Sequence, residues 1–206
     1  MTMPNATPRP PLSPGRALLL VTIGRYLAEA RLQEVRDGIS ELEIQKLAYF
    51  LQVLGAPLRL DFARGRYGPY APALGHTLDA MEGHHLTGLG DRSARVTEFA
   101  PINPVGESLD TAERLVAAEP ALRQRLLSVL DLVEGFETPY SLELLATVHL
   151  AAGHVPQTAD PAALADRVAS WSLREARLFT PKHVAVAARR LAGNDLLPVT
   201  AGPLPR

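Results

Sequence analysis

The chain has 206 residues, of which 47% are hydrophobic and 21% are charged, as in an ordinary folded protein. It contains no apolar stretch of the roughly 18 residues that a membrane span needs, and no secretory signal, so we expect a cytoplasmic protein without membrane contact. The absence of cysteine excludes disulfides, thiolate nucleophiles and thiolate metal sites.

Charge is distributed unevenly along the chain, although the net charge is only −1. Residues 67–140 hold eleven acidic against five basic side chains, a local charge of −6, whereas both ends are slightly basic. Such a block argues against phosphate binding in this region and permits docking onto a basic surface. A solvated acidic face is an equally weighted alternative. We therefore do not expect nucleic acid as a partner.

Proline marks the start of the chain and the start of several predicted helices. Residues 1–13 are typical of a Pro-rich linker or disordered arm, residues 14–197 are predicted to form one helical domain, and residues 198–206 a disordered tail. A short polar residue followed by proline favours a helix start, because the polar side chain caps free amides and proline lacks an amide hydrogen that has no partner there. The predicted starts are Ser13-Pro14, Asn103-Pro104, Thr138-Pro139, Asp160-Pro161 and Thr180-Pro181.

Two helices are defined most clearly. Ser40 and Glu43 form a capping box, flanked by Ile39 and Ile44 as a hydrophobic staple, and an apolar stripe follows up to Gly55. Residues 139–152 are apolar nearly all round, which predicts a central helix enclosed by the others.

Extended structure is expected at two places, residues 58–62 and 84–102. In the second, segments 86–88 and 96–99 are placed to pair as a small hairpin or wing. The predicted fold class is therefore mainly α, a multi-helix globular domain with a small β-hairpin or wing.

Catalytic signatures are absent from the sequence. It lacks a nucleophile elbow, a zinc-protease helix motif and a phosphate loop. The histidines at 76, 84 and 85 have no carboxylate or thiolate at a ligand spacing and are interpreted as surface residues, whereas His149 is predicted to be a hydrogen-bonded core histidine. We therefore predict no catalytic residue, no metal, no cofactor and no enzyme activity.

Several segments, in order and at matching spacing, resemble the C-terminal toxin-binding domain of the DarG antitoxins. The first part comprises residues 43–52, EIQKLAYFLQ, continued by 58–62 and by YGPYAP at 67–72. The second comprises EGFETPY at 134–140, LELLATVH at 142–149 and RLFTP at 177–181. The first part alone is also similar to the wider Panacea group of antitoxin domains.

The resemblance implies an antitoxin that neutralises a DarT-like DNA ADP-ribosyltransferase toxin by direct binding. A DarG antitoxin also carries an N-terminal macro domain that removes ADP-ribose from DNA, and this chain resembles only the other half. A macro domain fused or encoded upstream is accordingly a second expected association, and the hydrolase function is not expected here. The acidic block suggests that the domain blocks the active site of the toxin by mimicking single-stranded DNA.

Partner-binding residues are predicted where carboxylates and aromatic rings fall at helix junctions. Gly68-Pro69 is expected to form a turn that projects the neighbouring tyrosines. The candidates are Tyr67, Tyr70, Glu134, Phe136, Glu137 and Tyr140.

The alternative function is a winged-helix DNA-binding regulator. In that case residues 180–192 read DNA through Lys182, Arg189 and Arg190, and the segment near Val96 forms the wing.

Overall fold

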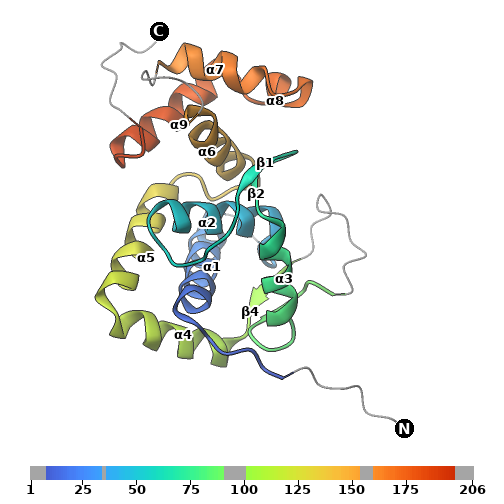
Figure 1. Ribbon diagram of the computed structural model, residues 1–206, viewed down its shortest axis with the longest axis vertical. Helices are drawn as coiled ribbons and strands as arrows, with labels where there is room; N and C mark the ends of the chain where they lie inside the picture. The colour runs from blue at the N-terminus through green and yellow to red at the C-terminus, as the bar shows by residue number, and fades with distance from the viewer. Residues whose placement is uncertain (1–7, 34–35, 91–100, 154–159, 198–206) are drawn as a thin grey trace.

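The computed structural model describes residues 8–33, 36–90, 101–153 and 160–197 (Figure 1). Within these ranges, the helices are α1 (Pro14–Gln33), α2 (Glu41–Val53), α3 (Pro72–Met81), α4 (Gly106–Ala118), α5 (Pro120–Val133), α6 (Pro139–Ala152), α7 (Pro161–Ala169), α8 (Leu173–Leu178) and α9 (Pro181–Gly193). The strands are β1 (Ala63–Gly65), β2 (Gly68–Tyr70), β3 (Leu86–Thr87) and β4 (Asn103–Pro104). The predicted mainly α fold class is confirmed. None of the described helices has the length and apolarity needed to cross a membrane.

Four of the five polar residue–proline pairs start a helix as predicted, those of α1, α6, α7 and α9. The pair Asn103-Pro104 does not, because these two residues form β4 and pair antiparallel with Leu86 and Thr87. The side-chain oxygen of Asn103, which would accept from the amides of a first helical turn, accepts instead from Arg31 at 3.0 Å. Helix α4 therefore begins at Gly106.

The capping boxes of α2 and α6 explain why these two helices begin where they do. The amide of Glu43 donates to the Ser40 hydroxyl, and the Glu43 carboxylate accepts from the Ser40 amide at 3.0 Å. At α6, Thr138 and Ser141 make the same reciprocal exchange. Each box satisfies amides that the first turn of a helix leaves without partners.

The helices lie in two groups that meet at α2 and α6 (Figure 1). In one group, α1 packs against α4, α5 and α2; in the other, α6 packs against α9 and α7. Helix α6 also contacts α2 and β2, so it joins the groups. The β1–β2 hairpin lies beside α6 where the two groups meet.

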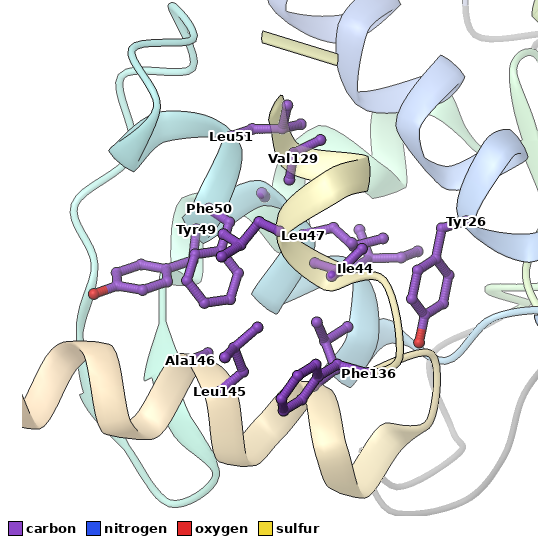
Figure 2. Close-up of a cluster of buried hydrophobic side chains, with 14 of the residues drawn as sticks. Tyr26, Ile44, Leu47, Tyr49, Phe50, Leu51, Val129, Phe136, Leu145 and Ala146 are labelled. Atoms are coloured by element: carbon purple, nitrogen blue, oxygen red, sulfur yellow. The ribbon is translucent and has the colours of Figure 1, made fainter. Parts of the chain in front are cut away.

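The core at this junction consists of apolar side chains from α2, α5 and α6 (Figure 2). Ile44 and Leu47 of α2 lie between Val129 of α5 and Leu145 of α6, and all four are fully buried. Burying one such side chain contributes about 1.5–3 kcal/mol. The prediction that residues 139–152 form an enclosed central helix is confirmed, since eight of the fourteen residues of α6 are buried.

Extended structure lies only partly where it was predicted, since β3 falls in the expected segment 86–88. Residues 58–62 form no strand, because the Gln52 side chain accepts from the Leu60 amide at 2.7 Å and donates to its carbonyl at 2.6 Å. Strands β1 and β2 follow instead, and the turn between them is Arg66-Tyr67, not Gly68-Pro69. Residues 96–99, the expected partner of β3, lie outside the described residues.

Candidate functional site

A pocket of about 210 Å³ lies between the first turns of α2 and the β1–β2 hairpin; we call it the hairpin pocket. Its lining residues are Glu41, Leu42, Gln45, Lys46, Gly65, Arg66, Tyr67 and Tyr70. The four residues from α2 recur at the spacing that brings side chains onto one helix face, which is why a single face of this helix lines the pocket.

Lys46 is the buried cation of this pocket, with 1% of its surface exposed. Its ammonium donates to the carbonyl of Pro69 in β2 at 2.7 Å. Burial lowers the pKa of Lys46 to about 8, and the nearby Glu143 carboxylate offsets part of this change. Lys46 therefore loses its proton more readily than an exposed lysine does.

Glu143 on α6 and Arg174 on α8 form an ion pair next to the pocket. Two guanidinium nitrogens of Arg174 contact the two carboxylate oxygens of Glu143 at 2.6 and 3.0 Å. This pairing raises the pKa of Arg174, so the group stays charged. The guanidinium also lies over the ring of Tyr67, 4.6 Å from its centre, and thereby fixes one aromatic wall of the pocket.

The hairpin is held to the helices by side chains on both sides. Gln45 exchanges two hydrogen bonds with the backbone of Ala71, directly after β2. On the other side, Gly68 approaches α6 so closely that a Cβ atom would lie 2.5 Å from Oγ1 of Thr147. With φ at +79°, the backbone of Gly68 also adopts a conformation that side chains disfavour. The hairpin position therefore depends on glycine.

A second, more polar pocket of about 410 Å³ lies further along α2. Its lining residues are Tyr49, Gln52, Val53, Leu60, Asp61 and Phe62. The Tyr49 hydroxyl lies 2.7 Å from Nδ1 of His149, and burial lowers the pKa of this histidine to about 4. His149 is thus hydrogen-bonded and neutral at physiological pH, as predicted.

His85 lies in a different environment from the one predicted. No group of three or more His, Cys, Asp or Glu side chains in the described part of the chain could hold a metal ion. His85, interpreted as a surface residue, is instead buried between Ser108 and the carbonyl of Pro10, 3.1 and 2.7 Å from its ring nitrogens. The arm around Pro10 covers it, which its sequence context does not reveal.

Of the six predicted partner-binding residues, the structure brings two together. Tyr67 and Tyr70 line the hairpin pocket. Glu134 is exposed and lies apart from them, at the C-terminal end of α5, where its carboxylate is 3.4 Å from Arg190.

Phe136 and Glu137 lack the exposure that the prediction assumed, with 8% and 6% of their surface accessible. The carbonyl of Glu137 accepts from Arg36 at 3.2 Å, and Phe136 packs into the core beside α6. Tyr140 is half-buried, and its hydroxyl donates to the carbonyl of Leu178 at 3.0 Å. The short loop between α5 and α6 thus turns inward, a direction that a charged and glycine-containing segment does not suggest.

Sequence analysis missed Lys46, Glu143 and Arg174. Two of these residues could have been found from the sequence. Lys46 on α2 and Glu143 on α6 are charged residues on helices that are otherwise apolar on the side facing the core. Charged side chains are almost never buried without a partner, so two such positions predict a shared network.

No protein-family model matches the chain. The chain is 42% identical over 179 residues to a protein of Thermus aquaticus named DNA ADP-ribosyl glycohydrolase, a match that covers 87% of this chain and 46% of that protein. Proteins of the same name from Mycobacterium bovis and Mycobacterium tuberculosis are each 39% identical over 183 residues, covering 86% of this chain and 52% of theirs. The chain spans about half the length of these curated relatives.

These relatives overturn the predicted function. Their name describes an enzyme that removes ADP-ribose from DNA, so the assignment to a toxin-binding antitoxin domain that mimics DNA and has no enzymatic role is wrong.

The winged-helix alternative gains no support. Arg190, expected to read DNA, donates instead to the carbonyls of Leu132 and Asp131 and lies beside Glu134. The segment near Val96, the expected wing, lies outside the described residues.

Proposed function

We propose that this chain takes part in the removal of ADP-ribose from DNA, and that the hairpin pocket contacts the modified nucleotide. The observation that carries the proposal is the identity of 39–42% over 86–87% of the chain to proteins named DNA ADP-ribosyl glycohydrolase. A DNA substrate places such a protein in the cytoplasm of a bacterium.

The chemistry of the hairpin pocket fits this reaction. Hydrolysis of a glycosidic bond requires a carboxylate that activates water, and the reacting sugar gains positive charge in the transition state. Glu41 is the carboxylate among the lining residues, while the exposed Arg66 supplies a cation that attracts phosphate. Glu41 lies in the first turn of α2, where the helix dipole favours a negative charge.

The charge of the residues that line the hairpin pocket also fits a DNA substrate, whereas the acidic residues 67–140 as a whole do not. Two of the eight lining residues, Lys46 and Arg66, are basic, and one, Glu41, is acidic. The proposal therefore departs from the expectation, based on residues 67–140, that nucleic acid is not a partner.

The test is release of ADP-ribose from an ADP-ribosylated oligonucleotide by the purified chain, followed by mass spectrometry. We expect Glu41→Gln to lower the rate by about 10²-fold or more, the usual contribution of a general base. Glu107→Gln is the matched control, since Glu107 is also an acidic residue in the first turn of a helix but does not line the pocket. Equal rates for the two variants would remove Glu41 from the reaction, and no release above a mock preparation would contradict the proposal.

A further inference from the structure

We infer that the group entering the hairpin pocket is the planar ring of a nucleobase; this rests on the proposed function and names the part of the substrate that the pocket holds. Its size gives the first argument. Sites for a complete drug-sized ligand measure about 300–1,000 Å³. At about 210 Å³ the hairpin pocket is smaller, so it accepts one ring system and not a whole ADP-ribose.

The aromatic walls give the second argument. Tyr67 is fixed by Arg174, whose guanidinium is held in place by Glu143. Tyr70 is 36% exposed although its ring is large and apolar. A rigid ring and an exposed ring in one small pocket are the arrangement on which proteins stack bases, because every base has a π-face.

Polar groups at the pocket fit the rest of a nucleotide. Arg66 is exposed and close to the ring of Tyr67, 5.6 Å from its centre, and so presents its charge to a phosphate joined to the bound base. The pocket therefore offers aromatic rings for stacking and a cation for a phosphate.

Two rings of this kind occur in the proposed substrate, namely the adenine of ADP-ribose and a base of the DNA. Calorimetric titration and saturation-transfer NMR of the full chain distinguish them, with adenosine monophosphate, thymidine monophosphate, ADP-ribose and ribose 5-phosphate as probes. We expect binding of base-containing probes, with the strongest transfer to ring protons, and no binding of ribose 5-phosphate at the same concentration. Preference for adenosine monophosphate and ADP-ribose identifies adenine, whereas tighter binding of a single-stranded oligonucleotide than of its abasic form identifies a DNA base.

Variants of the pocket then test the stacking directly. Tyr67→Leu should weaken binding of the preferred base-containing probe about tenfold or more, and Tyr67→Phe should leave it within about threefold, because phenylalanine keeps the ring. Arg66→Ala should weaken nucleotides but not the corresponding nucleosides, while Arg123→Ala, an exposed arginine on α5 outside the pocket, should change neither. If melting temperatures show that Tyr67→Leu is unfolded, the exposed Tyr70→Leu replaces it.

Three results overturn the inference: ribose 5-phosphate binding as tightly as the nucleotides, no binding of any base-containing probe, or equal affinities for the leucine and phenylalanine variants. Release of ADP-ribose without base binding refutes this inference and leaves the proposed function intact. Base binding without release of ADP-ribose supports this inference and contradicts the proposed function.

Discussion

Two clusters of buried charge share helix α2, and they differ in whether a pocket opens beside them. Glu43 belongs to the first, with its carboxylate 2.7 and 2.8 Å from Arg36, 2.9 Å from the Tyr26 hydroxyl and 3.0 Å from the Ser40 amide. Neither side chain of the Arg36–Glu43 pair is more than 5% exposed. This carboxylate is surrounded by donors, so the cluster has a structural role.

Lys46, less than one turn further along α2, belongs to the second cluster, which comprises Lys46, Glu143, Arg174 and Tyr67. Here a pocket lies alongside, and the amine has a lowered pKa. The comparison shows that burial of a charge does not by itself identify a functional site. Adjacent space is the feature that separates the second cluster from the first, because burial also raises the pKa of Tyr26 in the first cluster.

The largest effect is expected from breaking the first cluster. Glu43→Ala removes the capping carboxylate and leaves Arg36 and the Tyr26 hydroxyl buried without their partner. Loss of one partner from a buried ion pair costs about 3–5 kcal/mol, which urea denaturation measures as a drop in the free energy of unfolding. Glu29→Ala, at an exposed position on α1, is the control and should change it by less than about 0.5 kcal/mol. A small effect of Glu43→Ala would show that the cluster is not structural.

The next effect concerns the hairpin that encloses the second cluster. Gly68→Ala combines backbone strain with contact between the new Cβ and Thr147, and should destabilise the fold by about 2–4 kcal/mol. Gly135→Ala is matched, because Gly135 has the same φ of +79° but no atom within 4 Å of an added Cβ. Its cost should be only the strain, about 1–2 kcal/mol. If thermal denaturation shows the same loss of stability for Gly68→Ala and Gly135→Ala, the hairpin moves to make room for the added methyl group.

A smaller effect follows from the altered pKa of Lys46. Its pKa is about 8 in the folded chain against 10.5 unfolded, so the unfolded chain binds more protons between these values and stability rises with pH in that window. The slope should not exceed about 1.4 kcal/mol per pH unit. Urea denaturation from pH 8 up to pH 10.0, where unfolded tyrosines titrate, measures it. Lys46→Met should flatten the slope, and an unchanged slope would show that Lys46 does not titrate there.

The smallest effect is expected at the surface. Arg25 and Glu113 form an ion pair at 2.8 Å, but their side chains are 58% and 37% exposed. Because water screens such pairs, Arg25→Ala should lower the free energy of unfolding by at most about 1 kcal/mol. Added salt should make this difference smaller still. Denaturation in low and high salt measures the difference. A loss comparable to that of Glu43→Ala would contradict the view that burial sets the strength of the first cluster.

The sequence by itself determined the mainly helical fold, the start of α2 and the full extent of α6. These features depend on groups within a few residues of each other: the box of Ser40 and Glu43, and the cap of Thr138 followed by an apolar run. Local hydrogen bonds and apolar periodicity are properties of the chain order, and for this reason they can be read without coordinates.

Only the tertiary structure decided where the strands, the loop between α5 and α6, and the candidate site lie. Segment 58–62 forms no strand because Gln52 binds Leu60. The candidate site joins Lys46 of α2 to Pro69 of β2, and the pocket ring of Tyr67 to Arg174 of α8. Tyr67 and Arg174 are separated by more than a hundred residues, and their contact depends on how α6 packs between the two groups of helices. Packing over such distances in sequence has no local signature, so the charged residues that position Tyr67 could not be predicted.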